Sequence, residues 1–252
     1  MTGERVTVLG VGIDNVDRAA ALQRISQFIQ AAKSDGERAP AHVVTANAEI
    51  VMSAASAADM GDILAAASLV VPDGIGVVWA ARVMGTPLPE RVAGIDLMWE
   101  TLRLCAAQGW RPFFLGAAPG VAQEALAALQ LKIPGLACAG CHHGYFHTED
   151  EPAIVAEINE SGADLLLVAL GAPRQEKWIA AHKKELQVPV AVGVGGSLDI
   201  WAGKAVRAPR WMCDMGLEWS YRLLRQPQRA LRMLALPRFA WRVLWTKWRG
   251  EH

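Results

Sequence analysis

Residues 167–178, LVALGAPRQEKW, decide the fold, because they read as a buried strand that runs through a tight loop into a helix. The apolar run ends at Gly171, Pro173 fixes the backbone φ angle, and a polar group of residues then opens an amphipathic segment. In an open α/β sheet, ligands bind at the carboxyl ends of strands, where loop amides and helix N-termini can bind phosphate. We therefore expect Gln175 and Lys177 at a ligand site, although an ordinary strand-to-helix connection would read the same way.

The same alternation of strand and helix patterns continues on both sides of this stretch. It predicts a mostly parallel sheet with helices on both faces. A chain of 252 residues is long enough for one large α/β domain and an appendage. The expected strands are residues 6–9, with a turn at 10–12, and residues 42–47, 68–71, 112–116, 164–170 and 189–194.

The last part of the chain differs from the rest in charge and composition. Eight of the 25 basic residues and none of the 25 acidic residues lie between Trp219 and Gly250, where they alternate with tryptophan and leucine. This mixture is typical of helices that lie in a membrane interface. A helix over residues 237–249 would be only about 20 Å long, too short to cross a bilayer. We therefore predict a catalytic domain at 1–206 and a basic, Trp-rich helical appendage at 207–252.

Other features of the sequence indicate a cytoplasmic protein. The N-terminal residues have no signal-peptide pattern, and no segment has the roughly 20 apolar residues that cross a membrane. Four cysteines give no disulfide framework. Cys138, Cys141 and His142 match the spacing of a c-type haem attachment site, and the nearby histidines could suggest zinc, but we expect an ordinary structural role because haem attachment requires export.

Polar residues mark the ends of two expected strands. Thr45 and Asn47 lie two residues apart and so point to the same side of a strand. Asp73 lies between a proline and a glycine. A carboxylate there either stabilises a turn or takes part in catalysis. The glycine-rich segments do not complete a dinucleotide-binding motif, and no Asp-x-Asp pair is present to hold a metal. A bound diphosphate would therefore need amides, helix dipoles and cationic side chains to neutralise it.

Several stretches together resemble the WecG/TagA/CpsF glycosyltransferases, in the same order along the chain. The resemblance implies an inverting enzyme with a Rossmann-like domain that moves a sugar from a UDP donor to a saccharide on undecaprenyl diphosphate, in bacterial cell-surface polysaccharide synthesis. It also implies a peripheral position on the inner face of the cell membrane. We expect neither a metal nor a cofactor, since the sequence has no Asp-x-Asp clamp. The stretches are residues 45–49, 72–76, 91–96, 144–146, 170–178, 193–196, 207–209 and 216–223, followed by Pro227 and Arg229.

The resemblance also implies roles for individual residues. Asp73 resembles the general base, and Thr45 and Asn47 resemble its neighbours. The residues that resemble the donor pocket are Tyr145, Gly171, Gln175, Gly195, Gly196 and Asp199. The basic residues that resemble the acceptor and diphosphate site are Arg91, Arg222, Arg229 and Arg232.

Two other interpretations stay open at this point. A nucleotide-binding protein could use the basic tail to contact nucleic acid, since interleaved tryptophan and arginine can stack on single strands. A nicotinamide oxidoreductase is the second. We favour the transferase and expect no nucleic-acid partner, while homo-oligomers are compatible with the apolar tail. The sequence does not select among N-acetylmannosamine, its uronate, glucose and other hexoses as the sugar.

Overall fold

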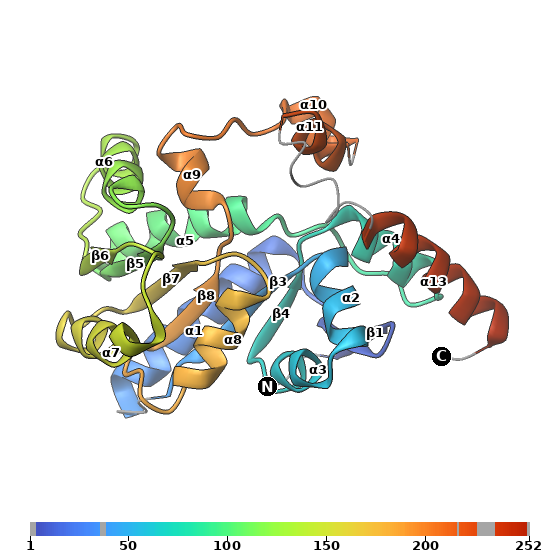
Figure 1. The fold of residues 1–252 in the computed structure, drawn as a ribbon, viewed down its shortest axis with the longest axis horizontal. Helices are drawn as coiled ribbons and strands as arrows, with labels where there is room; N and C mark the ends of the chain where they lie inside the picture. The colour runs from blue at the N-terminus through green and yellow to red at the C-terminus, as the bar shows by residue number, and fades with distance from the viewer. Residues whose placement is uncertain (1–3, 36–38, 216, 226–234, 251–252) are drawn as a thin grey trace.

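The computed structural model describes residues 4–35, 39–215, 217–225 and 235–250. Its centre is a six-stranded sheet in which every pair of neighbouring strands is parallel (Figure 1). This confirms the predicted mostly parallel α/β sheet. In spatial order the strands are β4 (Leu69–Pro72), β3 (Ala41–Ala46), β8 (Val190–Gly193), β7 (Leu165–Ala169), β5 (Pro112–Gly116) and β6 (Gly140–His142).

Helices cover both faces of this sheet. The strands are buried on both sides, and alternate residues such as Leu166 and Leu167 of β7 belong to different core clusters. One face is covered by α1 (Arg18–Asp35), α5 (Gly94–Gln108), α6 (Val121–Lys132) and α9 (Ser197–Trp201). The other is covered by α2 (Ala48–Ser56), α3 (Ala58–Ala65), α4 (Ile75–Val83), α7 (Glu151–Glu160) and α8 (Arg174–His182), with the short 3-10 helix η1 (Thr148–Asp150) ahead of α7.

The N-terminal segment corrects the predicted strand 6–9 and turn 10–12. It is an antiparallel hairpin of β1 (Arg5–Val8) and β2 (Val11–Asp14). Leu9 and Gly10 have φ angles of 51° and 83°, and a two-residue loop with positive φ at both positions matches the right-handed twist of a hairpin. The Asp14 carboxylate accepts the Val70 N–H at 2.7 Å and so attaches the hairpin to β4.

Two further features concern short elements. The edge strand β6, which pairs with β5, is not among the strands expected from the sequence. The helical segment after β3 is divided into α2 and α3 at Ala57, whose backbone is extended. Strands of three residues and extended single residues carry too little periodicity to be recognised in a sequence.

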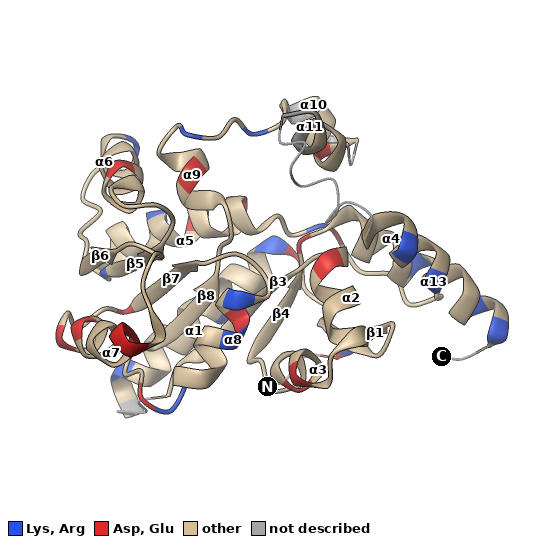
Figure 2. Cartoon of the chain, viewed as in Figure 1, with Lys and Arg blue, Asp and Glu red and all other residues tan. Residues whose placement is uncertain are grey.

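The appendage helices lie in two separate places on the molecule (Figure 1). The short helices α10 (Arg210–Asp214) and α11 (Glu218–Arg225) lie together, and α13 (Ala235–Arg249) packs beside α2 and α4 (Figure 1). Figure 2 shows basic residues along α13. None of the helices in the described ranges is long and apolar enough to cross a membrane. The division at residues 206 and 207 stays a prediction.

The two sides of α13 have different surroundings. Phe239 and Val243 are 1% and 0% exposed and belong to the same core cluster as β1, β2, α2 and α4. The outer side exposes Trp241, Leu244, Trp245 and Trp248. The last helix is therefore part of the core through one side only.

Replacing Phe239 with alanine is expected to lower the free energy of unfolding by about 3–5 kcal/mol, the usual cost of removing a buried phenyl ring. Urea unfolding followed by circular dichroism measures it. Trp248, which is 78% exposed, is the control, since Trp248→Ala should change the stability by less than about 0.5 kcal/mol. Equal changes in the free energy of unfolding for the two substitutions would contradict the packing of α13 against α2 and α4.

Candidate active site

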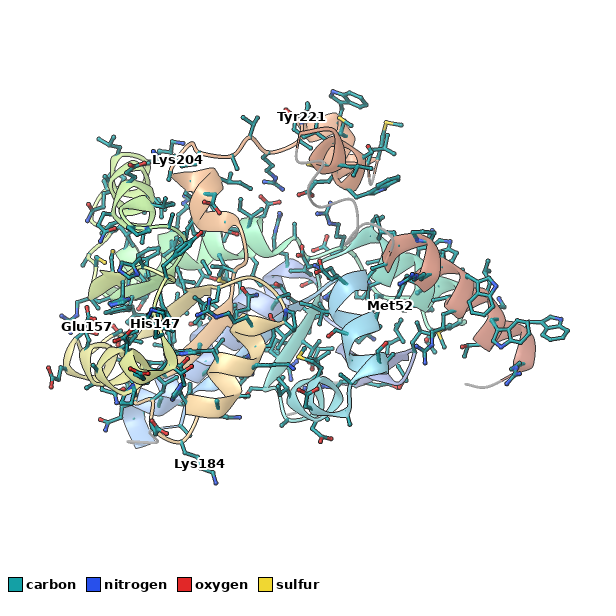
Figure 3. The ribbon with its side chains drawn as sticks, viewed as in Figure 1. Met52, His147, Glu157, Lys184, Lys204 and Tyr221 are labelled. Atoms are coloured by element: carbon teal, nitrogen blue, oxygen red, sulfur yellow. The ribbon has the colours of Figure 1, made fainter. Side chains whose placement is uncertain are left out.

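The candidate site lies at the carboxyl edge of the sheet. The helices that follow β3 and β7 cover one face, whereas those that follow β5 and β8 cover the other. Ligands of open α/β sheets bind where the connections of adjacent strands diverge in this way. In Figure 3, Lys184 precedes β8 and lies at the bottom, while Lys204 and Tyr221 follow β8 and lie at the top. The carboxyl edge and the helices α10 and α11 are therefore on the same side.

Asp73 is in the loop between β4 and α4. Its backbone N–H donates to the Ala46 carbonyl at 2.9 Å, and its carboxylate oxygen Oδ1 accepts the Gly94 N–H at 2.9 Å. The side chain is half-buried. These bonds place the carboxylate between the end of β3 and the start of α5, where it could accept a proton from a bound hydroxyl group.

Thr45 and Asn47 lie next to Asp73. Gly94, which donates to Asp73, is so close to Thr45 that an added Cβ would lie 2.9 Å from the Thr45 methyl carbon. Gly74 borders Asn47 in the same way, with 3.3 Å between an added Cβ and the Asn47 Cα. Asn47 also caps α2, since its Oδ1 accepts the Ile50 N–H at 3.0 Å. The two glycines thus allow the three predicted catalytic residues to come together.

Gln175 joins the loops after β7 and β8. Its side chain is 2% exposed, and the carboxamide oxygen accepts the Gly195 N–H at 3.0 Å. Its backbone N–H donates to the Gly171 carbonyl at 3.0 Å. Asp199 is close to the same loop, with its Oδ2 3.9 Å from a Cβ built on Gly196. Five of the six predicted donor-pocket residues therefore lie in the two adjacent loops after β7 and β8 or in the first turns of α8 and α9 that follow them.

Those two loops also connect to the Asp73 region. The Thr45 hydroxyl on β3 donates to the Gly193 carbonyl at the end of β8 at 3.3 Å. The strand order β4, β3, β8, β7 places the loops that follow these strands side by side. The candidate base and the candidate donor loops therefore share one edge of the sheet.

Tyr145, the sixth donor-pocket residue, is 73% exposed and lies further along the edge. With His142, His143 and Phe146 it lines a cavity of about 320 Å³ beside α7. The neighbouring Gly144 packs against Leu170, the residue before the Gly171 loop, with 2.9 Å between an added Cβ and a Leu170 methyl carbon. Tyr145 is thus joined to the donor loops through its backbone neighbour.

Arg91 connects the Asp73 loop to the appendage. Its Nε donates to the Asp73 carbonyl oxygen at 2.6 Å, and its Nη2 forms an ion pair with the Glu218 carboxylate of α11 at 2.6 Å. Its Nη1 donates to the Cys213 carbonyl of α10 at 3.3 Å. Burial acts to lower the pKa of Arg91, but the negative charges of Glu218 and Asp73 outweigh it, so that the guanidinium pKa is raised. The group stays a cation beside the predicted base.

A second ion pair strengthens this connection. Arg207, which leads into α10, contacts both carboxylate oxygens of Asp96 on α5 at 2.5 and 2.8 Å. Of the other predicted basic residues, Arg222 has its backbone in α11 but its side chain lies outside the described structure. Arg229 and Arg232 lie outside the described residues.

Two acidic residues of the site were not expected from the sequence. Glu176 is 0% exposed although it follows Gln175 in what looked like a solvated first turn of a helix, and Glu218 is 8% exposed. The only sequence signal for Glu176 and Glu218 is that they lie in stretches 170–178 and 216–223, which resemble the transferase family. Lys177, which we expected near a ligand, is exposed and pairs with Asp59 of α3 at 2.6 Å.

The cysteine and histidine cluster at β6 has the geometry of an ordinary edge strand. The Cys138 and Cys141 sulfur atoms lie 4.0 Å apart, and both side chains are half-buried. Within the described parts of the chain, no group of three or more histidine, cysteine or acidic side chains is arranged to hold a metal ion. These observations give no support to a haem or zinc site there.

Comparison with known proteins extends the resemblance over nearly the whole chain. Residues 6–252 match the model of the glycosyl transferase WecG/TagA/CpsF family. Proteins of Staphylococcus aureus strains MW2, NCTC 8325 / PS 47 and COL are each 35% identical to this chain over 239 residues, covering 95% of this chain and 92% of the relative. Each is named N-acetylglucosaminyldiphosphoundecaprenol N-acetyl-beta-D-mannosaminyltransferase.

Proposed function

This chain belongs to the WecG/TagA/CpsF family of glycosyl transferases, and we propose that it moves a hexose from a UDP-sugar to a saccharide on undecaprenyl diphosphate. The observation that supports this most is the position of Asp73. A single carboxylate lies beside Thr45 and Asn47, on the same sheet edge as the Gly171 and Gly195 loops that Gln175 joins. The names of the relatives favour N-acetylmannosamine as the sugar and an N-acetylglucosamine-bearing lipid as the acceptor.

In the proposed reaction, the acceptor hydroxyl attacks the anomeric carbon and inverts its configuration. Asp73 takes the hydroxyl proton as the new bond forms, and the bond between the sugar and the β-phosphate breaks to release UDP. Charge that develops on the departing diphosphate needs fixed dipoles and cations around it. The amides of the Gly171 and Gly195 loops supply the first, and Arg91 with Arg222, Arg229 and Arg232 of the appendage supply the second.

The proposed transferase uses no metal ion. Many nucleotide-sugar enzymes hold a divalent cation with an Asp-x-Asp pair, and this sequence has none. Its appendage instead carries arginines, whose rigid donors bind phosphate oxygens in pairs. The arginine side chains therefore neutralise the diphosphate charge that a metal ion would otherwise neutralise.

The lipid-linked acceptor also accounts for the amphipathic appendage. The polyprenyl chain of the acceptor stays in the bilayer, so an enzyme with no membrane-crossing helix among its described residues needs a surface that meets the bilayer. The exposed tryptophans and basic residues of α13 are suited to the inner face of the cytoplasmic membrane. We propose that the appendage holds the enzyme there while Arg91 keeps the Asp73 loop attached to it.

The direct test is transfer by the purified full chain from a panel of radiolabelled UDP-sugars to a detergent-dispersed N-acetylglucosaminyl-diphospho-polyprenol. We expect product from UDP-N-acetylmannosamine, at the same rate with and without EDTA. Transfer from none of the UDP-sugars, with product from another class of nucleotide sugar, would contradict the donor. Complete loss of activity with EDTA, restored by magnesium, would contradict the metal-independent reaction.

A further inference from the structure

We infer that Glu176 is a positioning residue for this transfer, because its buried carboxyl group sets the orientation of the Gln175 carboxamide and thereby holds the Gly195 loop. The inference rests on the proposed function, in which the Gly195 loop faces the donor diphosphate. It concerns a residue that touches neither substrate, and it accounts for a glutamate that is 0% exposed.

The hydrogen bonds around Gln175 define the role. A carboxamide has an oxygen that accepts and a nitrogen that donates, and the two ends have nearly the same shape. In this protein the oxygen must face the Gly195 N–H, which can only donate. The nitrogen then needs an acceptor, and it donates to the Glu176 Oε1 at 2.8 Å. If that acceptor were absent, the Gly195 N–H alone would favour this orientation of the carboxamide over its flipped form, and the buried NH₂ group would be left without its bond to Glu176.

The space for this pair depends on Gly193 at the end of β8. A Cβ added to Gly193 would lie 2.8 Å from the Gln175 carboxamide carbon and 2.8 Å from the Glu176 Oε1. The Gly193 carbonyl accepts the Thr45 hydroxyl on the other side, at 3.3 Å. A change in the Gln175 and Glu176 pair would therefore act on the loop after β8 from two directions, through Gly193 and through Gly195.

Burying the Glu176 carboxylate costs free energy, which an exposed glutamate would not lose. Burial raises the pKa of the Glu176 carboxyl group, the charge of Glu49 raises it further, and the hydrogen bond from Gln175 acts in the opposite direction. The second oxygen, Oε2, is buried with no hydrogen-bond partner among the described residues. A leucine would fill such a site at no electrostatic cost, so a glutamate there is explained by the bond to Gln175.

The test is a double-mutant cycle built from Gln175→Met, Glu176→Leu and the double variant, each assayed for transfer and for stability. If Glu176 acts through Gln175, each single variant should lower kcat/KM for the UDP-sugar by about 10–100-fold, and the double variant should be no worse than Gln175→Met. The KM for the lipid-linked acceptor should stay the same. Glu176→Gln, which keeps an acceptor oxygen, should recover most of the loss. A loss of kcat/KM in the double variant equal to the product of the two single-variant losses would overturn the inference.

A second measurement separates this inference from the proposed function. Hydrogen exchange of the peptide that contains Gly195, followed by mass spectrometry, reports the loop without any substrate. We expect faster exchange of this peptide in Glu176→Leu than in the wild type, and wild-type exchange in the control Glu160→Leu, where the exposed glutamate lies at the end of α7. Unchanged exchange in Glu176→Leu would overturn the positioning role even if transfer were detected. Faster exchange in a chain that transfers no sugar would leave the role intact and reject the function.

Discussion

Asp73→Asn is expected to lower kcat for sugar transfer by about 10²–10⁴-fold, the usual contribution of a general base. An asparagine cannot take the proton of the acceptor hydroxyl. Its side-chain oxygen can still accept the Gly94 N–H, the bond that the Asp73 carboxylate makes at 2.9 Å. The backbone bond to Ala46 does not depend on the side chain. The variant should therefore fold and bind UDP like the wild type, and only the chemical step should be lost.

The control for this variant is Asp59→Asn. Asp59 also carries a carboxylate in a hydrogen bond, but it lies on α3 and is exposed, where it pairs with Lys177. Its substitution should leave kcat unchanged. Steady-state kinetics with UDP-sugar and lipid-linked acceptor, together with UDP binding by calorimetry, measure both variants. A kcat within threefold of the wild type in Asp73→Asn would remove this carboxylate from the reaction.

The fold could be predicted because its signals are local. Each central strand is a short apolar run that ends in glycine, proline or a small polar residue, and each neighbouring helix has one apolar face. The hairpin of β1 and β2 was missed because Gly12, which suggested a turn, lies in the second strand, whereas the turn contains Leu9 in a backbone conformation that few leucines adopt.

The site could be predicted in part, and for a different reason. Asp73 and Gln175 were singled out by their positions after expected strands, whereas their roles and the choice of Gly195 came from the resemblance to a family. The structure places all three on one edge of the sheet. Glu176 and Glu218 looked like ordinary helix residues, because burial of a charged side chain depends on partners that are distant in sequence. Glu218 meets Arg91 across 127 positions of the chain, a distance at which no sequence periodicity applies.

The appendage yields the other large expected effect. Replacing Trp241, Trp245 and Trp248 together with serine should weaken binding to anionic vesicles by about 10–100-fold, if each ring loses about 0.5–1 kcal/mol of partial burial. The three indoles are 63%, 40% and 78% exposed, and consecutive ring centroids are 5.5 Å apart, so they form one continuous surface along α13. Transfer to an acceptor in vesicles should fall with binding, whereas transfer to a short-chain, water-soluble acceptor should not change.

Removing most of the appendage would not separate these effects. A deletion after residue 216 would also remove Phe239 and Val243 from the core and Glu218 from Arg91, so that membrane binding, stability and the Asp73 loop would all change at once. The triple serine variant changes only the outer side of α13. Its unfolding midpoint in urea should match the wild type, in contrast to Phe239→Ala. Vesicle flotation that is unaffected by the three substitutions, at low and at high salt, would show that another surface meets the membrane, because a helix that binds through its indoles must weaken when they are removed.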